Sequence, residues 1–415
     1  MKILICSFYF PPTGGGGVQR PLKFAQLLPE FGIETHVLAP SNARWMHHEE
    51  PPPALASRYL NHALFFGPRG RLPAEELYGR RGGDRLLRKF WLTPRRFLLP
   101  DEDVTWLPTA LAVATRIVRR ERIDVLLTTS PPTSVHLVGA LAQRLTGVRW
   151  VADVRDSIVA NHDRRLERRA ARAKEETHRS VARLVAKRAD AVVAVTDQIA
   201  AEMQEIEPST RVAVIPNGAD FDDFAGLSYQ RKGQFRITHT GSFFGKRDPR
   251  PFLTALARLG PEVIARFVGD FRRSDLDWVR ANGLEHRVEL LPYSPRQRSL
   301  ELQRASDALL LLLPDVGERG QDVPSGKLFE YLAARRPILG AVPPAGTAAQ
   351  LIREAGAGIV VAPDDVDGIQ HALEELLDRW RADGLADVSL PPALAQRISR
   401  RTHAGELAEL LQSIG

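Results

Sequence analysis

Short apolar segments alternate along the chain with longer segments in which apolar residues recur at helical spacing. In the first half the predicted strands are 2–8, 34–40, 124–130, 149–156, 190–196 and 211–218. The predicted helices between them include 18–32, 134–147, 163–188 and 198–206. Strands that alternate with helices are typical of a parallel sheet covered by helices on both faces, joined by right-handed crossovers.

The same alternation starts again at residue 235. The predicted strands are 235–242, 263–270, 287–293, 307–314, 337–342 and 357–363, and helices separate them. Between the two series, residues 216–234 are polar and show no periodicity, which favours a linker. We therefore predict an α/β protein with two doubly wound Rossmann-like domains: an acceptor-side domain 1–217, a donor domain 218–394, and a C-terminal helix 395–415 that packs back on the first domain.

Residues 41–105 interrupt this pattern with many Pro, Gly and Arg residues, and we interpret them as an insertion or long loop on the first domain. Within it, residues 78–100 combine at least seven Arg or Lys residues with Leu, Phe and Trp. This composition is typical of a segment that binds a membrane surface. The alternative is a loop whose aromatic side chains pack on their own domain.

Composition narrows the class of protein. The chain has 415 residues, 44% hydrophobic and 26% charged, as expected for a globular protein with two domains. Its single cysteine, Cys6, rules out an internal disulfide and fits a reducing compartment. The N-terminus is predicted to be a buried strand and not a signal peptide, and no apolar run is long enough to span a membrane. We predict a cytoplasmic protein, with peripheral contact at the inner face of the membrane as the extension of that prediction.

The net charge of +7 belongs mainly to the first half of the chain. A basic half could face anionic lipid, nucleic acid or a phosphorylated substrate. The alternative is a compositional bias, because Arg greatly outnumbers Lys. We predict no nucleic-acid partner.

Ligands of doubly wound sheets bind at the carboxyl ends of the strands, so the loops that follow the strands carry the candidate site. The first such loop contains four glycines, Gly14 to Gly17, before a helix predicted to begin at Val18. Glycines let backbone amides approach a ligand, and the helix start favours a phosphate or a sugar hydroxyl. The dinucleotide-binding spacing is absent. The alternative is a flexible loop.

A second loop, after the strand 149–156, brings together Asp153, Arg155 and Asp156. Two acids and a cation at a strand end could orient hydroxyl groups or exchange a proton. The alternative is a buried salt-bridge cluster that joins strand to helix.

The third loop follows the first strand of the second domain. Gly241, Ser242, Lys246 and Arg247 lie there, and cations on a glycine-rich turn suit a departing diphosphate. The alternative is a solvated turn.

The fourth loop leads into a helix that opens with Ser325, Gly326 and Lys327. Ser325 is a favourable N-cap, but a lysine in the first turn opposes the helix dipole unless an anion lies between them. This turn therefore predicts a phosphate site. Glu330 lies one turn further on, eight positions after Asp322; the alternative for Glu330 is an exposed helix residue.

In this order, the motifs resemble those of the family 4 retaining glycosyltransferases. The family's Gly-Gly-Val-Gln turn matches residues 16–19, its PNG-x-D motif matches 216–220, and its two acids at E-x7-E spacing match Asp322 and Glu330, with Asp in the first place. The resemblance implies the GT-B fold, in which two Rossmann-like domains face a central cleft. It also implies that Glu330 bonds the nucleotide ribose, while Asp322 and the amides after it hold the donor sugar.

Two departures from the family pattern concern charged residues. Ser242 and Arg247 stand where many members have an Arg and a Lys, so Lys246 or Lys327 is expected to compensate. Arg155 stands where many members have a His. The segments TTSPPTSVHLVG and WVADVRD resemble a subgroup that builds envelope polysaccharides or glycosylated metabolites.

We therefore predict transfer of a sugar from a nucleoside diphosphate sugar, most simply a UDP-sugar, to the hydroxyl of a soluble or lipid-linked acceptor, with retention of configuration. The site residues are assigned as follows: catalytic Asp153, Arg155, Asp156, Arg247, Asp322 and Glu330; donor-binding Gly16, Gly17, Gly241, Ser242, Lys246, Arg247, Tyr293, Ser325, Gly326, Lys327 and Glu330; acceptor-binding Gln19 and His136. We predict no cofactor and no metal, because cations and a helix start already supply positive charge. The alternatives are a nucleotide-sugar epimerase of GT-B shape and a non-catalytic sugar-nucleotide binding protein.

Overall fold

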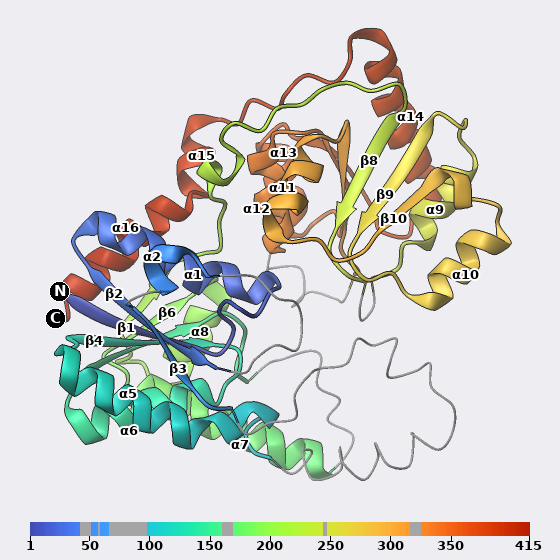
Figure 1. The fold of residues 1–415 in the computed structure, drawn as a ribbon. Coiled ribbons are helices and arrows are strands. Elements are labelled where there is room, and N and C mark those ends of the chain that lie inside the picture. Colours follow the sequence, from blue (N-terminus) through green and yellow to red (C-terminus); the bar gives the residue numbers. More distant parts are fainter. Residues whose placement is uncertain (42–50, 57–58, 66–97, 160–168, 244–246, 316–324) are drawn as a thin grey trace. The chain divides into compact units, whose positions relative to one another are not determined.

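The computed structural model describes residues 1–41, 51–56, 59–65, 98–159, 169–243, 247–315 and 325–415 (Figure 1). The chain forms two compact units. The first contains Met1–Pro216 and His403–Gly415, and the second contains Asn217–Thr402. No described helix has the length and the apolar character needed to cross a membrane.

The first unit is built on a parallel sheet of seven strands in the order β3-β2-β1-β4-β5-β6-β7. The strands are β1 (Lys2–Ser7), β2 (Glu34–Pro40), β3 (Leu60–Ala63), β4 (Val125–Ser130), β5 (Arg149–Val154), β6 (Ala191–Ala194) and β7 (Val212–Val214). The helices are η1 (Gly16–Val18), α1 (Gln19–Leu27), η2 (Leu28–Phe31), α2 (Pro53–Ala56), η4 (Glu102–Trp106), α5 (Leu107–Glu121), α6 (Val135–Thr146), α7 (Arg169–Arg188), α8 (Asp197–Ile206) and most of α16 (Arg400–Gln412).

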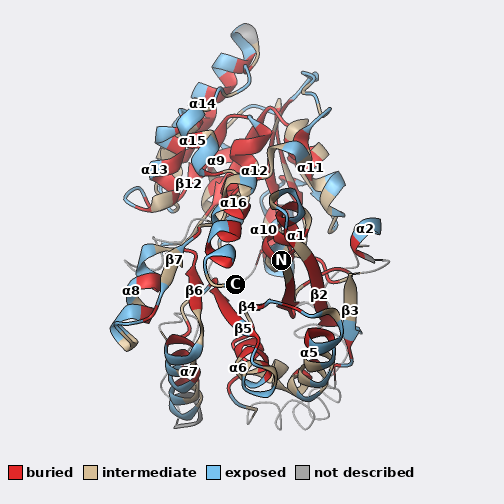
Figure 2. Cartoon of the chain, turned by 90° about the vertical axis from the view of Figure 1, so that its left-hand side faces the viewer, coloured by how far each residue is buried: buried red, intermediate tan, exposed pale blue. Residues whose placement is uncertain are grey.

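Both faces of this sheet are buried, which explains why its central strands are mostly apolar (Figure 2). Successive side chains of a strand point to opposite faces. Accordingly Ile3 and Ile5 join the core formed with α1 and α16, whereas Leu4 and Cys6 join the core formed with α5 and α6. The C-terminal helix α16 thus completes the core of the first unit.

Part of the interval 41–105 belongs to the sheet and is not an insertion. Leu60–Ala63 form β3, which pairs in parallel with β2, so that Val37 lies opposite Leu60. The hydrophobic pattern of this strand was hidden because it has only four residues and lies at the sheet edge. Most of the basic segment 78–100 lies outside the described residues.

The second unit has a parallel sheet of six strands in the order β10-β9-β8-β11-β12-β13. The strands are β8 (Phe235–Thr240), β9 (Val263–Val268), β10 (Val288–Leu291), β11 (Ala308–Leu312), β12 (Ile338–Ala341) and β13 (Gly358–Val361). The helices are η5 (Phe221–Phe224), α9 (Arg250–Ala257), α10 (Arg273–Ala281), η6 (Glu285–Arg287), α11 (Arg296–Arg304), α12 (Gly326–Ala334), α13 (Thr347–Glu354), α14 (Val366–Asp383) and α15 (Pro392–Arg397).

The segment 216–234 is not a loose linker. It contains the short helix η5, whose Phe224 is buried against α11 and α12. Tyr229 further along donates a hydrogen bond from its hydroxyl to the buried carboxylate of Asp307. The sequence pattern did not predict this packing, because it depends on a few aromatic side chains scattered among polar residues.

In each parallel sheet, the order in which successive strands are added reverses at one point between two neighbouring strands. In the first sheet this point lies between β1 and β4, and in the second between β8 and β11. Loops on either side of such a point diverge to opposite faces and leave a crevice in which ligands bind. The loops after β8 and β11 therefore define the candidate donor site, and those after β1 and β4 define its counterpart in the first unit.

Candidate active site

Lys327 lies in the first turn of α12, directly beside the end of β8. Its ammonium lies 3.2 Å from Nε2 of His239. The other ring nitrogen of His239, Nδ1, lies 2.9 Å from the carbonyl of Leu310 and can only donate to it. His239 is therefore the neutral tautomer with Nε2 as acceptor, and Lys327 donates to it.

This environment is unfavourable to a charged lysine. Burial and the nearby guanidinium of Arg247 lower the pKa of Lys327 to about 7, and the opposing attraction of Glu330 is weaker. No carboxylate forms an ion pair with the Lys327 ammonium within the described ranges. The positive charge at this helix start is thus left without a counterion, an arrangement that an anionic ligand would stabilise.

Gly241 makes this approach of Lys327 geometrically feasible. Its φ is +109°, a conformation that side chains disfavour, and a Cβ here would lie 2.4 Å from the Lys327 ammonium. The next residue, Ser242, donates a hydrogen bond from its hydroxyl to Asp270. The Ser242 side chain therefore links the loop after β8 to the loop after β9.

Glu330 is held in place by two residues of α11. Arg296 donates to one carboxylate oxygen at 2.6 Å, and Gln303 donates to the other at 3.3 Å. Arg296 also binds Asp223 at 2.7 Å, and this pair of carboxylates raises its pKa against the effect of burial. The Glu330 side chain is only 21% exposed, so it is not a free surface residue.

The other residues predicted to bind the donor differ in where the structure places them. Ser325 occupies the N-cap position of α12, but its side chain makes no capping hydrogen bond, contrary to the expected cap. Gly326 begins the helix and is exposed. Tyr293 follows β10, an edge strand that β9 separates from β8, so the topology places it away from the β8–β11 crevice. Asp322 and Lys246 lie outside the described residues.

In the first unit, Asp153 forms a buried ion pair. Nε and NH2 of Arg20 donate to its carboxylate at 2.9–3.1 Å, and the hydroxyl of Thr129 donates at 2.7 Å. Arg20 also donates to the carbonyls of Ile215 and Pro216. Because Asp153 is 1% exposed and fully engaged, the assigned catalytic role is not supported; it ties β4, β5 and α1 to the end of the unit.

Arg155, at the end of β5, connects the loops around the crevice. It donates to the carbonyls of Ser130 and Gly17. Its remaining nitrogen, NH2, is buried and has no hydrogen-bond partner in the described part of the chain. Burial is the main reason that the pKa of Arg155 is lowered, and Asp153 and Asp156 oppose this effect. Arg155 therefore fixes the glycine turn and keeps one donor available.

Asp156 lines a pocket of about 190 Å³ at the carboxyl edge of this sheet. The other polar side chains of the lining are those of Tyr9, Asp101, Asp103, Ser130, Thr133, Ser157 and His178. Asp101 accepts hydrogen bonds from the backbone and hydroxyl of Ser134, yet burial raises its pKa. Acids and hydroxyls that converge on one cavity suit a ligand with many hydroxyl groups.

The two residues assigned to the acceptor are buried. His136 is 0% exposed, and its Nδ1 lies 2.9 Å from the hydroxyl of Thr128, which also accepts from Trp150. Burial lowers the pKa of His136 to about 4. Gln19 is 6% exposed. Neither side chain reaches the pocket surface, so direct contact with an acceptor is not supported.

Several residues of these two sites carried no recognisable signal in the sequence. They are His239, Arg296, Gln303 and Tyr331 near Lys327, and Asp101 and His178 in the pocket. The Tyr331 hydroxyl accepts a hydrogen bond from the backbone N–H of Thr240 and so holds the last residue of β8 in position. No three His, Cys, Asp or Glu side chains of the described ranges lie close enough together to hold a metal.

Residues 15–218 match the model of the glycosyl transferase 4-like domain family. Residues 15–218 therefore form a domain of this family. The match begins in the glycine turn and ends just after the boundary between the two units, so it covers the whole sheet of the first unit except β1. No curated protein sequence gives a significant match.

Solved structures establish the fold of the whole chain. HepE from Anabaena, solved with UDP-glucose, is 17% identical, and the match covers 100% of both chains with a TM-score of 0.64. Sucrose-phosphate synthase from Thermosynechococcus elongatus is 16% identical, with 100% and 96% of the chains covered and a TM-score of 0.60. A putative UDP-N-acetylglucosamine 2-epimerase from Listeria monocytogenes is 13% identical, with 99% and 96% covered and a TM-score of 0.54. The protein thus has the GT-B fold, which serves more than one reaction.

Proposed function

We propose that the protein transfers a sugar from a nucleoside diphosphate sugar to an acceptor hydroxyl and retains the configuration at the anomeric carbon. The observation that carries this proposal is the ammonium of Lys327, which lies at a helix start beside Gly241, at the switch point of the second sheet. No carboxylate of the described residues forms an ion pair with it. A diphosphate supplies the counterion that this arrangement lacks. UDP is the favoured nucleotide, since HepE was solved with UDP-glucose.

Each candidate residue has a role in this proposal. Lys327, Arg247 and the start of α12 stabilise the charge that develops on the leaving diphosphate. Glu330, held by Arg296, accepts hydrogen bonds from the ribose hydroxyls. Asp322 is assigned to the donor sugar by its motif spacing alone. We expect no metal requirement, so chelation with EDTA should leave turnover unchanged.

The acceptor is proposed to bind the pocket that Asp156 lines. Its acidic and hydroxyl-bearing lining favours a neutral, hydroxyl-rich acceptor such as a sugar, within envelope polysaccharide or glycosylated metabolite synthesis. The acceptor is either soluble or lipid-linked. The basic segment 78–100 motivates the lipid-linked alternative. Co-sedimentation with anionic vesicles that is lost at high salt would support it, and no binding would favour a soluble acceptor.

The first test is nucleotide binding. UDP, GDP, TDP and ADP are compared by thermal shift on the wild type and on Lys327→Met. A nucleotide at about 100 times its dissociation constant stabilises the folded state by about 2.7 kcal/mol. We expect one diphosphate to stabilise the wild type and to lose most of this effect in the variant. Stabilisation by none of the four would contradict the proposal.

The second test is turnover. UDP-sugars are incubated with and without an acceptor panel, free UDP is measured, and the anomeric configuration of any product is determined by NMR. Acceptor-dependent UDP release with a retained product supports the proposal. Conversion or release without any acceptor would identify an epimerase, and nucleotide binding without turnover in any arm would indicate a binding protein.

A further inference from the structure

A second cavity in the C-terminal unit lies at the opposite ends of the strands from Lys327. Its volume is about 350 Å³, and it is formed by the backbone of 226–228, by α11 and by the first strands of the sheet. Arg236 is near the start of β8, whereas Gly241 follows its end. At about 3.3 Å per residue, these positions are about 16 Å apart, so the cavity is distinct from the candidate donor site.

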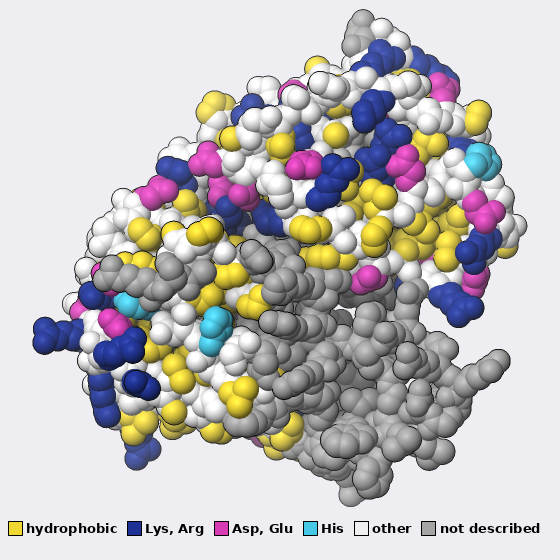
Figure 3. Space-filling model, viewed as in Figure 1, with side chains coloured by type: hydrophobic (Ala, Val, Ile, Leu, Met, Phe, Trp, Pro, Cys, Tyr) yellow, Lys and Arg dark blue, Asp and Glu magenta, His cyan; other side chains and the backbone are white. Residues whose placement is uncertain are grey.

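Four cations line this cavity: Lys232, Arg236, Arg266 and Arg298. Figure 3 shows Lys and Arg side chains gathered over the starts of β8 and β9, beside α11. A cavity of this size is within the range of small-molecule sites. Its charge therefore determines which ligand it suits.

The carboxylates around the cavity do not balance these cations. Arg236 and Arg266 share a single carboxylate, that of Glu289, at 3.0 and 2.8 Å. Arg298 pairs with Glu301 at 2.9 Å, and Lys232 has no ion pair among the described residues. Counting only the residues that the structure describes, four cations face two carboxylates, which leaves two positive charges uncompensated.

The two arginines that share Glu289 are largely buried. The side chains of Arg236 and Arg266 are 14% and 13% exposed. Burial lowers the pKa of Arg266, the hydrogen bond and charge of Glu289 oppose this, and repulsion from Arg236 and Arg298 adds to it. Arg266 donates to Glu289 only through Nε, so its terminal nitrogens have no hydrogen-bond partner in the described ranges. The single carboxylate of Glu289 can neutralise only one of these two buried charges, so a further anion would stabilise the pair.

We propose that this cavity binds a compact phosphate-bearing small molecule, at a site separate from the donor nucleotide. The planar guanidinium of Arg266 offers paired donors that match two phosphate oxygens. Arg298 and Lys232 supply further charge at the cavity mouth. Inorganic pyrophosphate is a suitable probe, since it carries several negative charges and has no base or sugar to select the donor site.

The experiment is a calorimetric titration of pyrophosphate at fixed ionic strength. All proteins carry Lys327→Met, which removes the main cation of the candidate donor site. The double change Lys232→Gln/Arg298→Gln should weaken binding at least tenfold, because it removes two cavity charges. The matched control is Arg280→Gln/Arg379→Gln, which removes two exposed charges elsewhere, 57% and 56% exposed, and should bind unchanged.

Folding does not limit this test, because Arg298 is 60% exposed and Lys232 is also exposed. A further variant, Arg266→Lys, keeps the charge and removes the paired donors, so we expect it to weaken binding as well. Absence of pyrophosphate binding in the Lys327→Met background would overturn the proposal. Equal binding by the cavity double variant and the control would overturn it too, since the signal would then be non-specific.

Discussion

At the scale of single residues, the two candidate sites differ in how their charges are compensated. Asp153 is neutralised by Arg20 inside the protein, whereas no carboxylate of the described residues forms an ion pair with Lys327, whose ammonium lies beside the neutral ring of His239. Removing one partner of a compensated buried pair destabilises the fold, whereas an uncompensated charge at a crevice is available for a ligand. Substitution of Asp153 should therefore change the free energy of unfolding, whereas substitution of Lys327 should change ligand binding.

The pKa of Lys327 predicts a pH dependence of nucleotide binding. The lysine is charged below pH 7 and largely neutral above it. A bound diphosphate favours the charged form, so binding above pH 7 requires uptake of a proton. The ratio of UDP affinity between the wild type and Lys327→Met should fall by up to about tenfold per pH unit as pH rises from 7. The variant serves as reference for titration of the nucleotide itself.

The same shift predicts the stability of the free protein. The unfolded chain holds a proton on Lys327 up to about pH 10.4, while the folded protein releases it near pH 7. Between these values the unfolded state binds more protons, so the free energy of unfolding should rise with pH. A difference between the wild type and Lys327→Met that does not change from pH 7 to 9 would contradict the assigned pKa.

Glu330→Ala should lower kcat by roughly two to three orders of magnitude, because a charged hydrogen bond to the ribose is lost. The control is Glu375→Ala on α14, a residue that is 59% exposed and remote from the candidate site. Steady-state kinetics with the preferred donor measure both. If a folded Glu330→Ala enzyme has wild-type kinetics, the Arg296–Glu330 pair is purely structural.

Asp153→Asn and Asp156→Asn should separate stability from acceptor binding. The first leaves Arg20 buried without its charged partner and should lower the free energy of unfolding by about 3–5 kcal/mol. The second changes an exposed side chain in the pocket, and should raise the acceptor KM without a change in stability. Urea denaturation measures the free energy of unfolding, and steady-state kinetics measure the acceptor KM. If Asp153→Asn has the same free energy of unfolding as the wild type, Asp153 has no structural role.

At the scale of elements, two glycines of the first unit have different roles. A Cβ on Gly17 would contact the Tyr9 side chain at an ordinary 3.7 Å. A Cβ on Gly139, in α6, would lie 2.2 Å from Nε1 of Trp150. A small side chain therefore fits at the first glycine without a clash, whereas the second lets a helix pack closely on β5.

Gly17→Val should therefore spare the melting temperature and abolish activity, because the side chain fills space meant for a ligand. Gly139→Ala should lower the free energy of unfolding by about 1–3 kcal/mol, because the core has no room for a methyl group. Thermal unfolding and turnover are measured on both. Normal activity of Gly17→Val would mean that the glycine run is only a loop.

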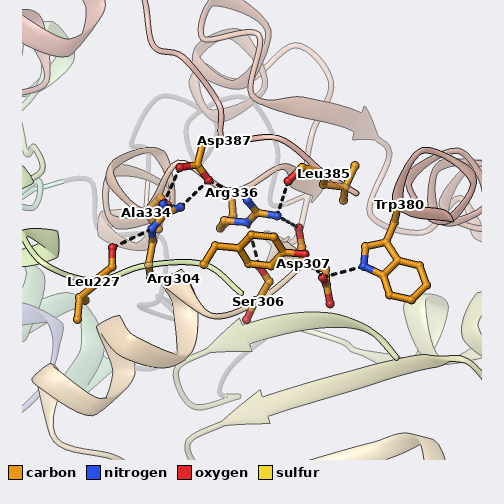
Figure 4. Close-up of polar contacts among 10 residues, drawn as sticks. Leu227, Arg304, Ser306, Asp307, Ala334, Arg336, Trp380, Leu385 and Asp387 are labelled. Carbon is orange, nitrogen blue, oxygen red and sulfur yellow. Dashed lines mark hydrogen bonds and ion pairs between the residues drawn. The ribbon is translucent and has the colours of Figure 1, made fainter. Parts of the chain in front are cut away.

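At the scale of the whole molecule, the second unit is held together by a buried arginine far from the candidate donor site. Arg336 donates to the carbonyls of Ser306, Asp307 and Leu385, and to the carboxylate of Asp387 (Figure 4). Its guanidinium also stacks at 3.6 Å on Tyr229. This network joins the segment after the unit boundary to β11, α12 and the chain that follows α14.

Arg336→Met should destabilise the second unit by about 3–5 kcal/mol, since three carbonyls and a carboxylate lose a charged donor. The control is Arg401→Met, whose side chain is 55% exposed and pairs with Asp222 at the surface. Urea denaturation followed by tryptophan fluorescence measures the change. A shift no larger than that of Arg401→Met would show that the network adds little to stability.

The parallel sheets, the division into two units and the loops that carry the candidate sites could all be predicted from the sequence. These follow from local pattern: apolar runs such as 308–312 form strands because both faces are buried, and ligand loops follow strand ends in any doubly wound sheet. The resemblance of short motifs then indicated the family. The sequence pattern did not predict β3 or the packing of segment 216–234, because each contains few apolar residues.

The contacts of each polar residue, in contrast, depend on the folded chain and could not be predicted from the sequence. Asp153 and Asp156 are three positions apart, yet one is sealed by Arg20 and the other faces a pocket. Glu330 is oriented by Arg296, which lies 34 positions away on α11. The pKa of Lys327 depends on burial and on Arg247, neither of which has a local signature. Burial and charge are sums over neighbours in space, and the order of residues along the chain does not contain them in readable form.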